Sequence, residues 1–339
     1  MKKTKLCNQQ IEKINNFKNS YVIYSLNELI TNDVERLLLN KKIGGEQFSM
    51  SLTGDAGSGK TALIQYIKEK FHDVDNPYKI IALRVPSKLT ISHLIKEILT
   101  QLQALQIKSN IKNETDKALT ERLVAYLKEL DVQLIVINEF QELIEFKSNA
   151  ERQRIANLLK LISEEAQIPF LFVGMPWSLD IAEDSQWASR LAINRDLPYF
   201  RLSNRKSVKQ YKEFLRHLSQ VLPFENKLDL ADKKYSLPLF SLSRGETRQL
   251  KRFLTEVITL AFINNANELA DVYFKQAYTN LYPNSDINLF EQDLNDMTFS
   301  EIKDYASYKK GEDGIYEKIE RTFFDKVPLA VLIGSKVSN

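Results

Sequence analysis

Residues 49–61 read SMSLTGDAGSGKT. The first five are typical of a short strand, and the next eight match the pattern G-x-x-x-x-G-K-[S/T] at every fixed position. Glycines allow the backbone to curl so that its N–H groups point at phosphate oxygens. A helix predicted over residues 61–71 adds the positive end of its dipole. The sequence therefore predicts a phosphate-binding loop formed by Gly54, Asp55, Ala56, Gly57, Ser58, Gly59, Lys60 and Thr61.

Two side chains of this loop, and a second acidic motif, point to ATP and Mg²⁺. Lys60 is expected to reach the β- and γ-phosphates, and the Thr61 hydroxyl is expected to bind Mg²⁺. P-loop ATPases usually also have a strand ending in Asp-Glu, in which Asp helps to hold the ion and Glu activates water. Residues 135–140 read IVINEF, so Glu139 is in place but Asn138 stands at the Asp position. Because Asn138 lacks the charge, we expect Mg²⁺ to bind weakly. The protein is then either a slow ATPase or a nucleotide-binding switch that barely hydrolyses ATP.

The order of predicted elements indicates an α/β fold. Apolar runs of strand length at 49–53, 79–85, 132–137 and 169–173, and a possible fifth at 197–202, alternate with helical patterns. Such alternation is typical of a mostly parallel sheet covered by helices on both faces. After residue 203 only helical patterns remain, at 208–218, 237–242, 247–263 and 269–281. The expected parts are an N-terminal helical segment at 1–40, a nucleotide-binding domain at 41–203 with a helical insertion at about 88–131, a small helical lid at 204–281, and a tail at 282–339.

Composition restricts the class of protein. The 339 residues are 43% hydrophobic and 27% charged, with a net charge of +3 and a single cysteine. One cysteine cannot form an internal disulfide and suits a reducing compartment. No apolar run reaches the roughly 18 residues that would suggest a membrane span, so we expect a cytoplasmic protein. Residues 201–216 carry six cations against Glu213 alone, either as a solvated face or as a functional surface.

An ordered series of motifs carries a family resemblance. It comprises the phosphate loop, LIVINEFQEL at 134–143, IPFLFVGMP at 168–176, DSQWASRL at 184–191 and GETR at 245–248. Over about 20–265 the chain resembles the TnsC/TniB family, the AAA+ regulators that choose target DNA for bacterial transposons. Two departures, Asn138 and the apolar Met175 at the family's first sensor position, point to weak hydrolysis.

The resemblance implies a mechanism and partners. Such proteins assemble with ATP into homo-oligomeric rings or filaments around double-stranded DNA, without reading its sequence. A target-selection protein or an RNA-guided CRISPR complex recruits them, and they then license the transposase. The alternative is an AAA+ signalling or chaperone-like ATPase that does not act on DNA. A small-molecule kinase ranks last because no acceptor-binding lid is evident.

The resemblance also implies residue roles. Arg190, or else Arg195, would reach the γ-phosphate of a neighbouring subunit, although either could instead form a surface salt bridge. Arg248 would contact the γ-phosphate from the lid, as the second sensor of initiator-type AAA+ proteins does.

The helical insertion supplies the DNA candidates, because initiator-type relatives place it toward the bore of the assembly. Lys88 and Thr90 lie at the start of its first helix, where free N–H groups and a positive charge suit a phosphate. Thr120 and Arg122 are second candidates, and all four could equally be ordinary surface residues. In the tail, residues 314–339 combine an amphipathic piece (Ile315, Ile319, Phe323, Phe324) with the apolar run PLAVLI. We expect this segment to dock on a partner, the transposase, with its own core as the alternative.

Overall fold

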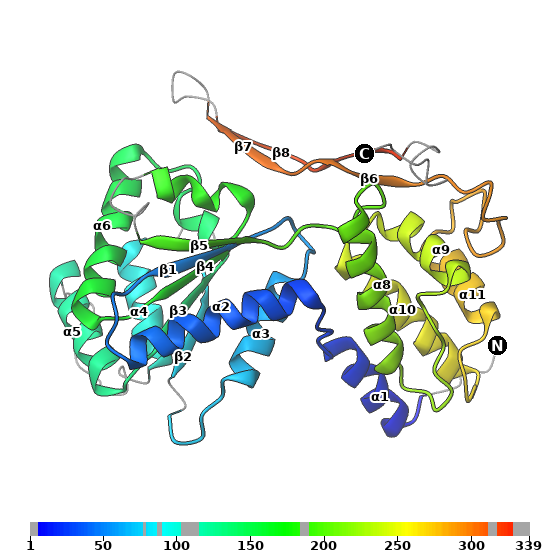
Figure 1. Cartoon of the computed structure of the whole chain (residues 1–339), viewed down its shortest axis with the longest axis horizontal. Helices are drawn as coiled ribbons and strands as arrows, with labels where there is room; N and C mark the ends of the chain where they lie inside the picture. The colour runs from blue at the N-terminus through cyan, green and yellow to red at the C-terminus, as the bar shows by residue number, and fades with distance from the viewer. Residues whose placement is uncertain are drawn as a thin grey trace.

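The computed structural model describes residues 6–76, 79–86, 90–102, 115–183, 190–310 and 317–327. It contains a sheet with helices on both faces, a helical lid and a long C-terminal extension (Figure 1). None of the helices in these ranges is long and apolar enough to cross a membrane.

Five parallel strands form the central sheet in the order β2-β3-β4-β1-β5. Their bounds are Ser49–Thr53 (β1), Ile80–Arg84 (β2), Leu134–Asn138 (β3), Phe170–Gly174 (β4) and Leu191–Asp196 (β5). β1 lies between β4 and β5, so the loop that follows it leaves the middle of the sheet. The carboxyl ends of β1 and β3 therefore present the two predicted nucleotide motifs at one edge.

The fifth strand corrects the sequence prediction, which placed it at 197–202. β5 ends at Asp196, and its exposed side chains alternate with the buried Leu191 and Ile193, as in a strand at a sheet edge. The more apolar segment that follows contains Pro198, which cannot donate a ladder hydrogen bond. Instead, Leu197 N donates to Thr53 O at 2.7 Å, and the segment connects the sheet to the lid.

Two layers of helices cover the two faces of the sheet, and alternate side chains of each strand pack against one layer or the other. Leu134 and Val136 of β3 pack in the core that contains α2 (Ser25–Lys42) and α3 (Lys60–Lys70). Ile135 and Ile137 face the other core, with α4 (Ile91–Gln101), α5 (Asp116–Glu129) and α6 (Asn149–Ala166). Because β3 is buried on both faces, it is apolar throughout. Short 3-10 helices follow β3 and β4 at Phe140–Leu143 (η2) and Pro176–Glu183 (η3).

The lid contains α8 (Arg205–Gln220), α9 (Lys233–Ser243), α10 (Thr247–Ile263) and α11 (Asp271–Leu281). The N-terminal segment divides between the two parts. α1 (Asn8–Asn19) packs against α10 of the lid, where Gln10 Nε2 donates to Phe262 O at 3.2 Å. α2 crosses the sheet of the nucleotide-binding domain (Figure 1).

The C-terminal extension, here called the arm (residues 300–327), runs from the lid to the nucleotide-binding domain along one side of the molecule (Figure 1). Its strands are β6 (Ser300–Asp304), β7 (Ser307–Lys310), β8 (Glu317–Glu320) and β9 (Phe323–Lys326), and they pair as the antiparallel ribbons β6-β9 and β7-β8. At the end of the arm over the nucleotide-binding domain, Phe146 N donates to the Tyr308 hydroxyl at 2.9 Å. The Trp177 ring stacks on the Tyr308 ring, with centroids 6.4 Å apart. At the lid end Phe324 stacks on Tyr199.

Partner docking of the segment 314–339 stays a prediction, and the structure describes only part of that segment. Its described part, 317–327, is β-structure that packs on its own chain. Ile315 and the run PLAVLI lie outside the described residues.

Candidate nucleotide-binding site

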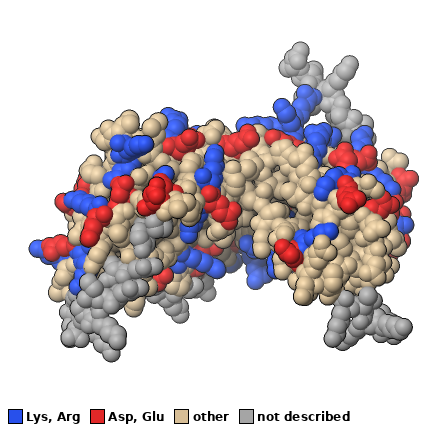
Figure 2. Space-filling model, turned by 90° about the horizontal axis from the view of Figure 1, so that it is seen from below, with Lys and Arg blue, Asp and Glu red and all other residues tan. Residues whose placement is uncertain are grey.

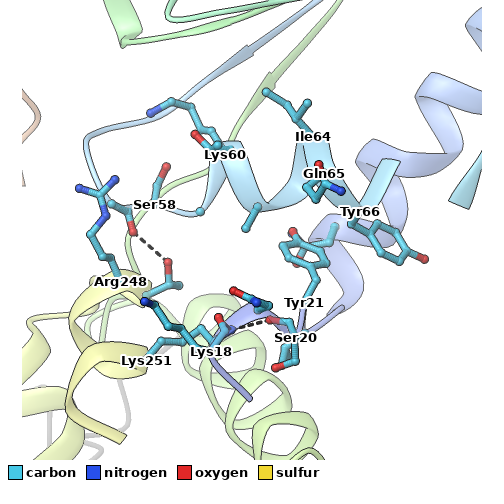
Figure 3. Close-up of a pocket in the computed structure, with 18 of the residues that line it drawn as sticks. Lys18, Ser20, Tyr21, Ser58, Lys60, Ile64, Gln65, Tyr66, Arg248 and Lys251 are labelled. Atoms are coloured by element: carbon cyan, nitrogen blue, oxygen red, sulfur yellow. Dashed lines mark hydrogen bonds between the residues drawn. The ribbon is translucent and has the colours of Figure 1, made fainter. Parts of the chain in front are cut away.

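A cavity of about 1420 Å³ lies between the sheet and the lid. One wall is the phosphate loop with the start of α3, and the opposite wall is α10 (Figure 3). The ends of β2 and β3 line its polar part. Tyr21, Val22 and Tyr66 line its other part, where the two tyrosine rings stack at 5.2 Å.

The backbone of residues 54–61 has the shape that a phosphate requires. Gly57 and Gly59 have φ of +86° and +103°, which side chains rarely tolerate. A Cβ at Gly54 would lie 2.6 Å from Leu197 O, so only glycine fits between the loop and the lid connection. α3 begins at Lys60, and its first N–H groups have no partner within the helix. The Ser58 hydroxyl is buried without a hydrogen-bond partner among the described residues, which suits a loop built for an anion.

Lys60 folds back onto its own loop. Its Nζ donates to Gly54 O at 2.7 Å and to Asp55 O at 3.0 Å, and Figure 3 shows the side chain turned toward the loop. Burial lowers the pKa of Lys60 to about 8, although the nearby Glu139 and Asp55 carboxylates oppose the shift. A phosphate oxygen would replace these carbonyls as its acceptor and would favour the charged amine.

Thr61 and Asn138 lie together, as a shared Mg²⁺ site requires. Asn138 Nδ2 is 3.5 Å from Thr61 Oγ1, and its Oδ1 accepts from Glu139 N at 3.1 Å. In this orientation the amide oxygen is engaged by the backbone, and the amide N–H faces Thr61. This pair therefore offers an ion one hydroxyl and no charge, in line with weak Mg²⁺ binding.

Two residues that the sequence analysis missed hold Glu139. Gln141 Nε2 donates to Glu139 Oε2 at 2.9 Å, and Arg84 Nη2 lies 4.0 Å from Oε1. Gln141 is buried, and its Oε1 accepts from Met175 N at 3.2 Å. The backbone of Met175 thus links the first sensor position to the glutamate through Gln141. Gln141 follows Glu139 by two residues in the sequence, but a glutamine at this position belongs to no motif that would have predicted its role.

The lid touches the phosphate loop directly. Thr247 Oγ1 and Arg248 N both donate to Gly57 O, at 2.9 and 3.2 Å. Arg248 and Lys251, one turn apart on α10, line the cavity (Figure 3). Lys251 Nζ donates to Lys18 O at 2.9 Å and to Ser20 O, and burial lowers its pKa to about 8. Cations from the lid thus face the cavity opposite Lys60.

The arm holds the back of the phosphate loop through Asp55. This buried carboxylate accepts from Ala56 N at 2.7 Å with Oδ1, and from Ala306 N at 3.2 Å with Oδ2. The Thr322 hydroxyl also donates to Oδ2, and the Tyr199 hydroxyl donates to Ala56 O. Both Ala306 and Thr322 belong to the arm, so the C-terminal extension reaches the nucleotide site.

The two predicted finger arginines are paired within the chain. Arg190 forms an ion pair with Glu164 of α6. Arg195 lies within β5 rather than before the fifth strand, and its Nε donates to the buried Asp33 Oδ2 at 2.7 Å. A role toward a neighbouring subunit would require either arginine to leave its partner, and it stays a prediction for both.

The predicted DNA candidates are placed unequally. Thr90 is exposed, and its hydroxyl accepts from His93 N at 3.4 Å as the cap of α4. Thr120 corrects the prediction, because it is buried and its hydroxyl donates to Asp116 O at 2.7 Å within its own helix. Arg122 is half-buried and has a partner within the chain. Lys88 lies outside the described residues, as does most of the motif at 184–191.

The family model for the bacterial TniB protein matches residues 11–201, which is more than half of the chain. The chain belongs to the TniB family. The match contains the phosphate loop and the Asn138–Glu139 motif, and it ends before the lid helices and the arm. No curated protein matches the chain in sequence.

Solved structures show the fold class. The ORC2 protein of Aeropyrum pernix, solved as ADPNP-ADP complexes, is similar over 78% of this chain and 70% of that chain, with a TM-score of 0.60 and 16% identity. Cdc6p of Pyrobaculum aerophilum covers the same shares with a TM-score of 0.58 and 16% identity. The Aeropyrum pernix ORC1 protein in complex with DNA is similar over 77% of this chain and 66% of that one, with a TM-score of 0.52 and 16% identity. The predicted fold class, an AAA+ domain with a parallel sheet and a helical lid, is confirmed.

Proposed function

We propose that this TniB-family protein is an ATP-dependent, DNA-bound regulator of transposition. The observation that carries the proposal is the closed arrangement of a phosphate loop under a lid that bonds to Gly57 O. Membership in the TniB family supports the link to transposition. We place the protein in the bacterial cytoplasm, where its DNA and its partners are.

ATP would lie along the cavity with its phosphates on residues 54–61. Lys60, Arg248 and the first N–H groups of α3 would neutralise the phosphate charge. The stacked Tyr21 and Tyr66, with Val22, offer the flat apolar surface that a purine base needs at the other end. Thr61 would hold Mg²⁺ through its hydroxyl, and Asn138 would contribute its amide oxygen only if the amide turned away from Glu139 N. When bound, the ion would supply charge neutralisation at the phosphates.

Glu139 would orient and activate the attacking water. Gln141 holds one of its carboxylate oxygens and Arg84 lies near the other, which fixes the direction of the side chain. With no carboxylate at Asn138, we propose that turnover is slow rather than absent. Slow turnover suits a scaffold that must persist on DNA until the transposase arrives.

The proposal includes assembly of several copies of this chain on duplex DNA. One of the structural neighbours, the ORC1 protein, was solved in complex with DNA. We propose that copies of this chain form a ring or filament on double-stranded DNA, contact its backbone without reading sequence, and connect a target-selection protein or RNA-guided complex to the transposase. Arg190 or Arg195 would then complete the site of a neighbouring subunit.

Electron microscopy with an ATP analogue and duplex DNA tests this proposal. The proposed function predicts ordered assemblies that need both the analogue and the duplex. The Lys60→Ala variant is the matched control, and it should form none. Identical assemblies without DNA would support the alternative, an AAA+ signalling or chaperone-like ATPase.

A further inference from the structure

Four cations form a stripe on lid helix α8. Arg205, Lys209, Lys212 and Arg216 follow one another at spacings of four, three and four residues. At 3.6 residues per turn they share one side of the helix. Tyr211, Phe214, Leu215 and Leu218 occupy the opposite side and are buried in the core. Three of the cations are exposed and Lys212 is half-exposed, so the stripe faces away from the protein.

The stripe has no counter-charge of its own. Within the described part of the chain none of its four cations has an ion-pair or hydrogen-bond partner. Glu213, the one acid on the helix, is committed elsewhere, because its Oε1 accepts from Ser25 N at 3.2 Å and its Oε2 from Ser25 Oγ at 3.0 Å. Glu301, near the start of the helix, accepts from Leu202 N at 2.7 Å and Ser203 N at 3.0 Å. On the face of the nucleotide-binding domain that Figure 2 shows, positive and negative side chains are interspersed.

Local stability does not account for these residues. Arg205 is in the first turn of α8, where a cation opposes the helix dipole, and that turn contains no acidic residue. Arg216 follows Lys212 by one turn, so like charges also repel along the stripe. An arrangement that is unfavourable in the free protein is expected where a negatively charged partner binds.

We infer that the α8 stripe is a contact surface for the phosphate backbone of duplex DNA. The stripe spans about 16 Å at 1.5 Å per residue, which follows one strand over about five base pairs. A protein partner is less well matched, because interface cores are depleted in lysine and need aromatic or apolar anchors. The stripe contains no such anchor. Phosphate contacts need only charge and bind without reading sequence.

This inference rests on the proposed DNA-bound function and gives it a second contact surface, on the lid rather than on the insertion. Side chains of α8 and α10 pack in one core, and α10 bonds to the phosphate loop, so the stripe lies on the same lid that contacts the nucleotide site.

The test is a salt titration of duplex binding, with an ATP analogue present, on a variant with Arg205, Lys209, Lys212 and Arg216 all changed to Gln. The matched control changes four exposed lysines on other elements to Gln, namely Lys13, Lys42, Lys70 and Lys233. Each lost phosphate contact lowers the slope of log affinity against log salt by about 0.9, so the stripe variant should lose about 2 to 4 from the slope. The control should retain the wild-type slope, and both should bind the analogue as wild type does.

Three results would overturn the inference. An unchanged slope for the stripe variant sinks it and leaves the proposed function intact. An unchanged slope combined with lost binding of another protein assigns the stripe to that protein instead. Absence of duplex binding by the wild type removes both the inference and the proposed function.

Discussion

The bond between the arm and the phosphate loop gives the sharpest quantitative prediction. Thr322→Val keeps the side-chain shape but removes the hydroxyl that donates to Asp55 Oδ2. Asp55 is buried, and among the described residues it would retain Ala56 N and Ala306 N as donors. Loss of a hydrogen bond to a buried charged group costs about 1.5 to 3 kcal/mol. Because the bond joins the arm to the rest of the chain, this cost falls on the local opening of the arm.

Hydrogen exchange of the backbone amides in β6 and β9 measures that opening. A loss of 1.5 to 3 kcal/mol corresponds to exchange that is about 10 to 150 times faster. Thr100→Val is the matched control, since Thr100 is exposed and its hydroxyl donates to Lys96 O within its own helix, far from the arm in sequence. It should leave the arm unchanged. Wild-type exchange rates in the Thr322 variant would show that Asp55 does not hold the arm and would refute the reasoning.

Three further predictions concern the nucleotide site. ATP affinity should fall by up to about tenfold per pH unit as the pH rises through about 8, because Lys60 of the free protein then loses its proton while a bound phosphate favours the protonated form. Calorimetry should show this pH dependence in the Lys251→Arg variant but not in Lys60→Arg. The reverse pattern would assign the titration to Lys251. Asn138→Asp should tighten Mg²⁺ binding by about tenfold, or about 1.4 kcal/mol, and wild-type affinity in a Mg²⁺ titration of phosphate release would contradict the weak-site account. Glu139→Gln should lower steady-state turnover by about 10² to 10⁴ with ATP binding retained, whereas retained turnover would exclude Glu139 as the base.

Local motifs predicted the part of the site that is local in sequence. The strand 49–53 and the loop 54–61 lie where they were expected because the glycines, the lysine and the following helix form one contiguous unit. Asn138 and Thr61 meet because parallel strands present their carboxyl ends at the same edge of the sheet. The core strands were found because burial on both faces makes them apolar throughout.

Features that depend on distant residues were not predictable in this way. The fifth strand was misplaced because an edge strand carries polar residues such as Asn194 and Arg195, whereas the connection after it is apolar. Arg195 finds Asp33 across 162 positions, and Thr322 finds Asp55 across 267. The motif predicts a lysine at position 60, but the hydrogen bond from Lys60 Nζ to Gly54 O depends on the curvature of the folded loop. Such contacts are properties of the tertiary structure.

The most direct test of the account is calorimetric titration of Mg-ATP into the wild-type protein and into Lys60→Ala. The cavity between sheet and lid is the ATP site in this account, and Lys60 supplies the cation that the β- and γ-phosphates need. The wild type should bind one ATP per chain, and the variant should show no binding at the same concentrations. Equal ATP affinity in the two proteins would contradict the account, because the phosphates would then lie somewhere other than residues 54–61.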